Sequence, residues 1–359
     1  MSFQEITATD LSAKHDNDAL RVKVLCPVDY GRWDAFVLAC REATFFHRAG
    51  WKDVIEQAFG HKTYFLYAEW DGRIEGVLPL GHISSRLFGN ALSSTPFCVY
   101  GGIAANSESA RHALYSYAQN LAREKGVDYL EMRNIHPQHS DWPAKDIYVT
   151  FRRDLDPDPA RNMAAIPRKQ RAMIRKGMSS GLQSYISEDM ETFYRVYAES
   201  VRNLGTPVFS LKYFRLLKQI FGEACELMMV KSPDSPVAGV MSFYFRDEVL
   251  PYYGGGVMEA RDLKANDYMY WELMRRSCER GIRVFDYGRS KKGTGSFRFK
   301  THWGFEPQPL YYEYYLVKGK EVPDISPLNP KYEVFINIWR RLPLPVTKFI
   351  GPHIIKNLG

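Results

Sequence analysis

ANDYMYWELMRRSCERGIRVFDYGRS (265–290) combines an amphipathic helix with a strand, and a single glycine joins the two. Apolar residues four positions apart, such as Met269 and Leu273, predict the helix. Gly281 ends it, because glycine adopts the left-handed conformation at a helix C-terminus without strain. Residues 282–290 then start apolar and become polar, which is typical of a buried strand whose end reaches a site.

The same order of elements occurs earlier in the chain, so the sequence contains an internal repeat. In RHALYSYAQNLAREKGVDYLEMRN (111–134), Gly126 corresponds to Gly281, 155 positions later. The expected strands before each helix are 63–70, 73–83 and 99–103 in the first half, and 226–232, 237–245 and 249–256 in the second. We therefore predict an α/β (α+β) fold of two related units, each with a mixed, mostly antiparallel sheet flanked by helices.

The repeat and the composition divide the 359-residue chain into four parts. DLDPDPA (154–160) is rich in proline and aspartate, which is typical of a linker. Further helices are expected at 189–203 and 211–221. The expected parts are an N-terminal unit (1–153), a linker with a basic helix (154–177), a C-terminal unit (178–320) and a helical tail (321–359). A cleft between the paired units would be a usual place for a ligand.

The charge balance favours an anionic partner. Lys and Arg number 48 and Asp and Glu 41, which gives a net charge of +7 and a pI near 9.0. The sequence IPRKQRAMIRKG (166–177) carries five of the positive charges within nine positions, and Pro167 suits the first turn of a helix. Because no base-reading motif accompanies these residues, we expect a phosphate-bearing substrate and no sequence-specific DNA binding.

Several other classes of protein are not indicated. No run approaches the roughly 18 apolar residues of a membrane span, and Met1 to Leu20 lack the apolar stretch of a secretory signal. The five cysteines form no CxxC pair, so neither a disulfide framework nor a zinc ribbon is expected. His136 and His139 flank Pro137, which favours a loop over a metal site.

These observations predict a cytoplasmic protein, with the inner face of the membrane as an alternative location. The carboxyl end (329–359) contains an expected helix with Trp339, and Arg340 and Arg341 lie beside its apolar face. This helix either packs on the body of the protein or makes peripheral contact with an anionic membrane.

FDYGRSKKGTGSFRFKTHWGFEP (285–307) is the densest polar cluster. Asp286 and Arg289 end the expected strand, and Lys300 follows a glycine-containing loop. Such a loop could wrap an anion with backbone N–H groups and nearby cations. The alternative is a solvated β-hairpin with basic edges.

Residues 249–307, with their glycine run, helix, VFDYGRS strand and GTGSFRFKTHWGFEP loop, resemble the second half of FemAB-type proteins. The resemblance covers about residues 20–320 and includes the basic helix. In the first half it rests on FFHRAGW (45–51), GVLPL (76–80), SSRLFG (84–89) and STPFCVYGG (94–102). It is strongest to the branch associated with PEP-CTERM/exosortase and exopolysaccharide gene systems, whose relatives are also called BioF2-like acetyltransferases.

The resemblance implies tandem GNAT-like acyltransferase domains and an N-acylation reaction. Lys300 in FRFK matches a family lysine placed near the reacting ester, where its charge could stabilise an oxyanion. The alternative is a structural cation that pairs with Asp286. Asp286 itself is a general base or an orienting group, and its repeat partner Glu131 equally suggests a structural role.

Other residues are expected to bind substrate. Arg289 and the basic helix, through Arg168, Lys169, Arg171 and Arg175, would hold phosphate. Tyr100 and Tyr253 occupy matched places in the repeat, and Gly254 and Gly255 would let the backbone approach a ligand, or else mark bulged strand ends. His47 and Trp51, four apart on an expected helix, would face a saccharide, or form a core Trp with a capping His. Asn266 and Asp267, at the start of the second-half helix, complete the set.

Two departures separate the chain from the family patterns. The GNAT pyrophosphate loop is missing between Gly256 and Asp267, which weakens acetyl-CoA as the donor. No heptad segment is long enough for the helical arm of some FemAB enzymes.

Three hypotheses remain. The first is transfer of an acyl or aminoacyl group from aminoacyl-tRNA or acyl-CoA to an amine of a small-molecule or lipid-linked glycan or peptidoglycan-type precursor. The second is a CoA-dependent acetyltransferase, and the third a non-enzymatic binding protein at a membrane. No tightly bound cofactor is expected.

Overall fold

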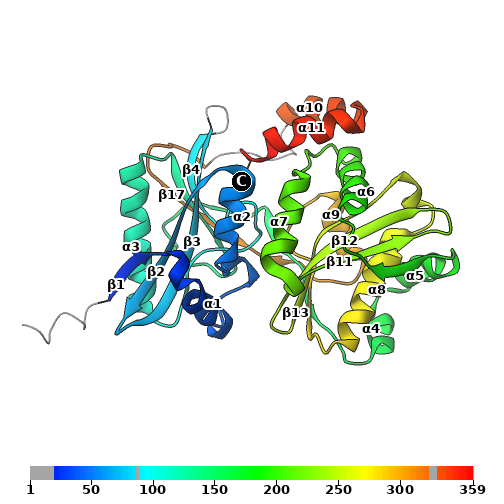
Figure 1. Ribbon diagram of the computed structural model, residues 1–359, viewed down its shortest axis with the longest axis horizontal. Coiled ribbons are helices and arrows are strands. Elements are labelled where there is room, and N and C mark those ends of the chain that lie inside the picture. Colours follow the sequence, from blue (N-terminus) through cyan, green and yellow to red (C-terminus); the bar gives the residue numbers. More distant parts are fainter. Residues whose placement is uncertain (1–19, 86–88, 323–329, 359) are drawn as a thin grey trace, which may run out of the picture.

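The computed structural model describes residues 20–85, 89–322 and 330–358. Two α/β units lie side by side, and the carboxyl-terminal helices cross the top of the molecule (Figure 1). Of the sequence features above, residues 1–19, the tip of SSRLFG (86–88) and the start of the tail (323–329) lie outside the described residues.

The first large sheet has the strand order β1-β2-β3-β4-β6-β17-β7, with β5 paired to β3. Its strands are β1 (Arg21–Val24), β2 (Lys62–Trp70), β3 (Arg73–Ser85), β4 (Gly89–Ser94), β5 (Ala104–Ala105), β6 (Tyr129–Asn134), β7 (Ala144–Lys145) and β17 (Tyr311–Leu316). The helical segments of this half are η1 (Pro27–Asp29), α1 (Tyr30–Ala39), η2 (Phe45–His47), α2 (Gly50–Phe59) and α3 (Glu108–Lys125).

The second large sheet has the order β10-β11-β12-β13-β14-β9. Its strands are β9 (Arg152–Asp154), β10 (Gln183–Ile186), β11 (Cys225–Lys231), β12 (Pro236–Phe245), β13 (Glu248–Gly256) and β14 (Val284–Asp286). The helical segments are α4 (Pro159–Ala165), α5 (Arg168–Ser179), α6 (Met190–Asn203), α7 (Leu211–Phe221), η3 (Gly222–Ala224), η4 (Met258–Arg261), α8 (Ala265–Glu279) and α9 (Gly295–His302). A separate small sheet has the strand order β15-β8-β16, formed by β15 (Ser290–Lys291), β8 (Tyr148–Thr150) and β16 (Gln308–Pro309).

Both units contain the same crossover, in which a strand and a helix are followed by a parallel strand. Helix α3 connects the β4/β5 side of the first sheet to β6, which pairs parallel with β4, and α8 connects β13 to its parallel neighbour β14. Gly126 and Gly281 follow these helices with φ of 59° and 74°, so both glycines adopt the expected left-handed conformation. The predicted fold of two related α/β units is confirmed.

One part of the repeat differs from the expectation. The segment 99–103 is not a strand: the chain leaves the first sheet after β4 and returns at β5, and both strands pair with β3. Ala105 lies opposite Gly76, as Gly255 lies opposite Gly239 in the second unit. Tyr100 is therefore in an inserted excursion, whereas Tyr253 is in a regular strand, and the two tyrosines do not occupy matched places.

The units exchange strands across the expected boundaries. Strand β17, from the end of the second unit, pairs with β6 and lies inside the first sheet. In the other direction β9 pairs with β14 at the edge of the second sheet. The segment expected as a linker begins at the last residue of β9 and continues into helix α4, so it is not irregular chain alone. Pairing between segments so far apart leaves no mark in local sequence periodicity.

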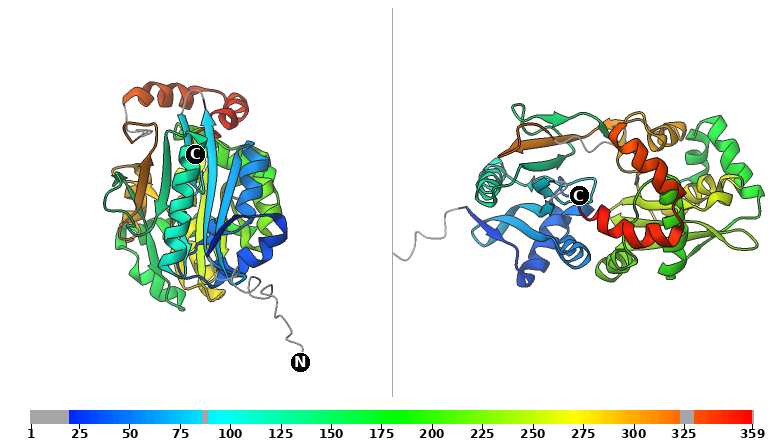
Figure 2. Two further views of the ribbon diagram at one scale, coloured as in Figure 1. Left: turned by 90° about the vertical axis from the view of Figure 1, so that its left-hand side faces the viewer. Right: turned by 90° about the horizontal axis from the view of Figure 1, so that it is seen from above.

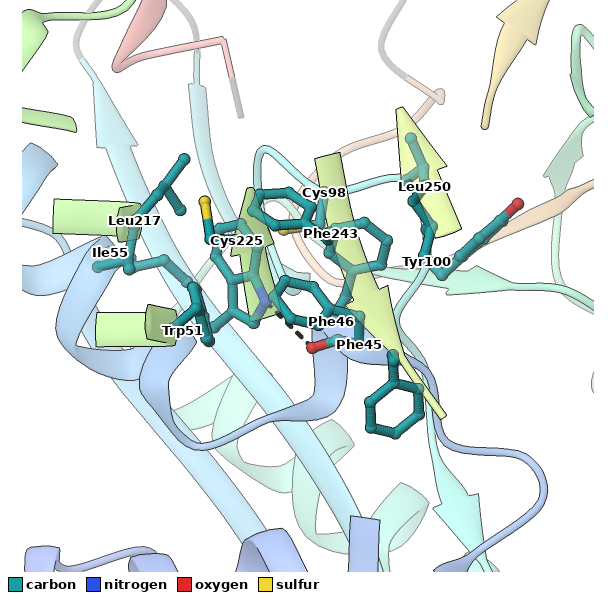
Figure 3. Close-up of a cluster of buried hydrophobic side chains, with 14 of the residues drawn as sticks. Phe45, Phe46, Trp51, Ile55, Cys98, Tyr100, Leu217, Cys225, Phe243 and Leu250 are labelled. Atoms are coloured by element: carbon teal, nitrogen blue, oxygen red, sulfur yellow. Dashed lines mark hydrogen bonds between the residues drawn. The ribbon is translucent and has the colours of Figure 1, made fainter. Parts of the chain in front are cut away.

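An aromatic core joins the two units (Figure 3). The rings of Phe45 and Phe243 are stacked with centroids 4.4 Å apart, and those of Trp51 and Phe221 are 5.2 Å apart. Phe45 and Trp51 come from the first unit, while Phe221 and Phe243 come from the second. One hydrophobic cluster therefore spans both units, and each unit also has a cluster largely of its own.

Two helices close the chain, α10 (Pro330–Arg341) and α11 (Leu344–Ile355). Pro343 precedes the first turn of α11, which agrees with the expected break after the first helix. Figure 2 shows both helices as an outer layer on one side of the molecule. Among the described residues, no helix is long and apolar enough to cross a membrane.

Candidate active site

Asp286 lies at the end of β14 and is completely buried. Its carboxylate accepts hydrogen bonds from Tyr100 Oη at 2.9 Å, Arg152 Nη1 at 3.1 Å and the backbone N–H of Gly288 at 2.7 Å, with Thr150 Oγ1 at 3.3 Å. Burial, together with the negative charge of Asp286, raises the pKa of Tyr100 well above its ordinary value. The carboxylate is so fully bonded that its arrangement favours an orienting role over that of a general base.

Lys300 lies on α9, whose first turn is capped by the hydroxyl of Thr294. The side chain is buried, and Nζ donates to the carbonyls of Gly288 at 2.8 Å and Arg289 at 3.0 Å. Burial lowers the pKa of Lys300 to about 7, while the nearby Asp286 carboxylate opposes this shift. An amine with such a pKa exists as both ammonium and neutral amine near neutral pH, which is uncommon for lysine and typical of reacting groups.

Arg289 lies beside Lys300 and reaches toward the first unit. Its guanidinium lies 4.7 Å from the ring centre of Tyr148, and Nη1 donates to Tyr312 Oη at 2.8 Å. Arg133 of β6 approaches the same Tyr312 ring at 5.5 Å. Two arginines, one from each unit, therefore converge on one tyrosine. Arg133 is buried and pairs with the Glu131 carboxylate, so Arg289 supplies the net positive charge at the junction.

The strands that lead to this site diverge. The parallel pairing of β13 with β14 covers only residues 248–249 and 284–285. Beyond it the side chain of Tyr270 fills the space beside β13: a Cβ at Gly254 would lie 2.5 Å from Tyr270 Oη. The ring of Tyr287 lies 5.1 Å from that of Tyr270, and its buried hydroxyl has no hydrogen-bond partner.

The structure brings together Lys300, Asp286, Arg289 and Tyr100 from the expected set. Sequence analysis missed four residues that complete the cluster: Arg133, Thr150, Arg152 and Tyr312. Arg133 lies within the strand expected after Gly126, where only Glu131, the repeat partner of Asp286, points to this region. No strand was expected at Arg152, which lies in β9. Tyr312 arrives through the strand exchange of β17, for which the sequence gives no signal.

The loop after Asp286 is more ordered than expected. Residues 290–291 form β15 and pair with β8, and FRFK lies on helix α9 rather than on a loop or a β-hairpin. Gly288 and Gly293 have φ of 66° and 79°, so each provides a left-handed turn. These turns direct the carbonyls of residues 288 and 289 toward the Lys300 amine.

The basic helix α5 packs on α8 and lies outside this cluster. A Cβ at Gly177 would meet Tyr268 Cβ at 2.8 Å, which shows how closely the helices approach. Arg171 is half-buried and donates to the carbonyl of Ala164 at 2.6 Å. Three of the expected phosphate-binding residues are exposed on α5: Arg168, Lys169 and Arg175. The amino end of α5 adjoins the site, since Pro167 lies against Gly304, just after α9.

Residues expected at the carboxyl end of β13 pack against their own unit. Tyr253 is buried and its hydroxyl lies 2.6 Å from that of Tyr213. Gly254 and Gly255 face Tyr270 and Ser200, so these glycines make room for side chains of the fold rather than for a ligand. The expectation that their backbone contacts a ligand is therefore not supported.

Asn266 and Asp267 begin α8 beside the basic helix. Asp267 accepts a hydrogen bond from Gln170 of α5, and burial raises the pKa of its carboxyl group. Asn266 Oδ1 is buried without a hydrogen-bond partner. Both residues border α5 and not the Asp286 cluster.

His47 and Trp51 are core residues. They lie on different elements, η2 and α2, and not on one helix. His47 Nδ1 accepts from the backbone N–H of Thr44 at 3.0 Å, and burial lowers the pKa of His47 to about 4. Trp51 Nε1 donates to Phe45 O at 3.2 Å. The expectation that they face a saccharide is not supported, because both side chains are buried.

Part of the second unit matches a known protein family. Residues 168–301 match the family model described as "Acetyltransferase (GNAT) domain". This segment includes Asp286, Arg289 and Lys300. Comparison with curated proteins gave no match.

Solved structures resemble the whole chain. The crystal structure of FemX has 13% identity and a TM-score of 0.65, over 88% of this chain and 100% of that chain. The C-terminal domain (DUF2156) of a putative lysylphosphatidylglycerol synthetase from Agrobacterium fabrum has 12% identity and a TM-score of 0.55, over 80% and 91%. A tandem GNAT protein from the clavulanic acid biosynthesis pathway has 14% identity and a TM-score of 0.51, over 85% and 100%.

The fold is therefore a tandem GNAT-like arrangement, and the chain is an acyltransferase. GNAT acyltransferases take acyl-CoA or aminoacyl-tRNA as a substrate and not as a tightly bound cofactor. Among the described residues, no group of three or more His, Cys, Asp or Glu could hold a metal ion.

Proposed function

We propose that this chain is a FemAB-like N-acyltransferase that moves an acyl or aminoacyl group onto an amine of a cell-envelope glycan or peptidoglycan-type precursor. The observation that carries the proposal is the buried Lys300 amine, with a pKa near 7, at the junction of the two units. A charge placed in so dry a position interacts strongly with any anion that forms beside it.

In the proposed reaction the acceptor amine attacks the carbonyl carbon of the donor ester or thioester. A C–N bond forms, the carbonyl oxygen becomes an oxyanion, and the Lys300 ammonium stabilises that charge. Collapse of the intermediate breaks the C–O or C–S bond, and the proton lost by the amine is taken up by the leaving group. Asp286 orients the segment that carries Lys300, through Gly288 N–H.

Positive groups around the reacting centre support a phosphate-bearing substrate. Arg289 lies at the junction, and the exposed cations of α5 lie farther along the second unit. Arg133 is buried and paired with Glu131, so it is not among them. We propose that they hold the phosphates of a nucleotide-linked or lipid-linked acceptor, or those of an aminoacyl-tRNA donor.

We extend the proposal to the biological setting on the strength of the sequence resemblance. The branch with the strongest resemblance accompanies PEP-CTERM/exosortase and exopolysaccharide gene systems, which make envelope glycans. An enzyme of that kind would work in the cytoplasm at the inner face of the membrane, where lipid-linked precursors are exposed.

The test is mass spectrometry of an envelope-precursor pool after incubation with the purified protein and each donor in turn. The expected result is a mass increase of one acyl or aminoacyl group on one precursor, lost in Lys300→Met. Lys292→Met is the matched control, because Lys292 lies on the same segment and is exposed. No mass change with any donor, or full turnover by Lys300→Met, would overturn the proposal.

Acetyl-CoA is the second candidate donor, and the GNAT match over residues 168–301 favours it. The segment before α8 argues against it. Lys264 caps α8 in a left-handed conformation without a side-chain hydrogen bond, and Gly256 packs against Ala260. Micromolar binding of acetyl-CoA in a calorimetric titration would favour this donor over aminoacyl-tRNA.

A further inference from the structure

Helices α10 and α11 are each docked on the rest of the molecule by buried residues, Trp339 on α10 and Thr347 on α11. On α10, Trp339 is buried and its Nε1 donates to the carbonyl of Thr206 at 3.1 Å. On α11, a Cβ at Gly351 would lie 3.0 Å from the backbone of Val208, so this helix also sits tightly on the loop after α6. These contacts fix which side of each helix faces outward.

The outward side is apolar on both helices. Val334, Ile338 and Phe349 are 66%, 56% and 75% exposed. Together with the less exposed members they form what we call the tail surface: Val334, Phe335, Ile338, Val346, Phe349 and Ile350. Large apolar side chains gathered on one surface mark a site of interaction with a protein or a membrane.

The charge of the same segment selects between these partners. Residues 330–358 contain five Lys or Arg and a single acidic residue, Glu333. Arg341 is exposed, whereas Arg340 donates to Leu204 O and Lys348 lies 4.9 Å from the ring of Tyr194, so these cations border the tail surface on its docked side. An apolar helix face bordered by cations is typical of a helix that lies in the interface of an anionic bilayer.

The far end of α11 also fixes the tail to the first unit, where Lys356 O lies 2.6 Å from His61 Nε2. The tail thus spans both units and cannot turn away from them without losing contacts on each side. A surface held in this way presents its apolar side chains without the entropic cost of ordering a free segment.

We propose that the tail surface docks on an anionic phospholipid bilayer and holds the enzyme flat against it. The apolar side chains would enter the acyl boundary while the exposed Arg341 pairs with a lipid phosphate and the other cations attract the anionic surface from the edge. This inference deepens the proposed function, since it supplies the surface from which a lipid-linked acceptor would reach the site. Its test needs no acyl donor and no acceptor.

The experiment is co-sedimentation of the full chain with vesicles of phosphatidylglycerol and phosphatidylcholine, or of phosphatidylcholine alone. We expect binding to the anionic vesicles that weakens with salt, and a loss of at least about tenfold in partition for the double variant Ile338→Glu, Phe349→Glu. Val28→Glu with Leu38→Glu is the matched control, because these exposed side chains lie elsewhere and the change in charge is the same. Circular dichroism verifies that both variants are folded.

Two outcomes would overturn the inference. One is equal vesicle binding by the tail variant and the control. The other is a wild-type dimer in sedimentation without lipid that becomes monomeric in the tail variant, which would make the tail surface a contact between two copies. A chain that binds vesicles and transfers no acyl group would overturn the proposed function alone.

Discussion

The phenol of Tyr100 in the first unit donates to the buried carboxylate of Asp286 in the second, with 2.9 Å between Oη and Oδ2. The same carboxylate accepts from the backbone N–H of Gly288, whose carbonyl receives the Lys300 amine. A contact between the units is therefore two hydrogen bonds away from the proposed catalytic lysine. Packing of the units and placement of the lysine depend on one anion.

Tyr100→Phe should destabilise the protein by about 1–3 kcal/mol, because it removes a hydrogen bond to a buried charge. Urea unfolding followed by tryptophan fluorescence measures the loss. Tyr117→Phe on the exposed side of α3 is the control and should change little. Equal stability of the two variants would mean that the other hydrogen-bond donors stabilise the Asp286 carboxylate without Tyr100.

The stability of Lys300→Met relative to wild type should depend on pH. Since the folded-state pKa of Lys300 is lowered to about 7 from 10.5, the unfolded chain binds more protons between these values. The free energy of unfolding of wild type should therefore rise relative to that of the variant as pH rises from 7 toward 10.5, by up to about 1.4 kcal/mol per pH unit. Below pH 7 the buried Lys300 amine is an ammonium, and the cost of burying it lowers the stability of wild type by its full amount.

Denaturant unfolding at several pH values measures this difference in the free energy of unfolding. Lys292→Met is again the control, and its difference from wild type should stay flat over the same range. A flat difference for Lys300→Met as well would show that its amine does not titrate in this window.

The rate of acyl transfer should fall as pH rises through about 7 if the Lys300 ammonium stabilises the oxyanion. Single-turnover rates over a pH series, with the donor identified by mass spectrometry, measure the profile. Removing the charge by Lys300→Met should lower the rate by about 100–1,000-fold. A rate that instead rises through pH 7 would assign the neutral amine as a base.

Gly254→Ala should destabilise the protein by about 1–3 kcal/mol, because its Cβ would lie 2.5 Å from Tyr270 Oη. Adding Tyr270→Phe should restore part of the loss by removing that oxygen. Gly31→Ala in α1 is the control, because a Cβ there meets nothing within 4 Å and alanine favours the helix. Thermal unfolding of the three variants tests the packing role of this glycine.

The sequence predicted the elements well where they repeat. The helices that end at Gly126 and Gly281 follow from apolar spacing and from glycine at the C-terminus. The bounds of most expected strands around them lie within one or two residues of the observed bounds. The sequence also singles out the region around Asp286 and Lys300, because several charged residues follow a buried strand there. Such signals come from residues close together in the sequence, so they can be recognised in one sequence alone.

The parts of the site that the sequence did not predict depend on contacts between distant segments. Tyr312 enters the site on a strand exchanged between units, and Thr150 and Arg152 enter from strands of three residues. The matched tyrosines were misassigned because residues 95–103 form an excursion within a sheet strand. Trp51 is buried against Phe221 and Phe243 of the second unit, a contact between distant segments. His47 is buried too, and its ring bonds to Thr44.

The position of β17 has a consequence for synthesis of the chain. Strand β6 needs Tyr311–Leu316 as its neighbour, so the first sheet cannot be completed until nearly nine-tenths of the polypeptide has left the ribosome. Until then β6 presents an open edge of the kind that invites pairing with other chains. A fragment ending near residue 153 would lack β17, so its first sheet would stay incomplete and the edge of β6 would stay exposed.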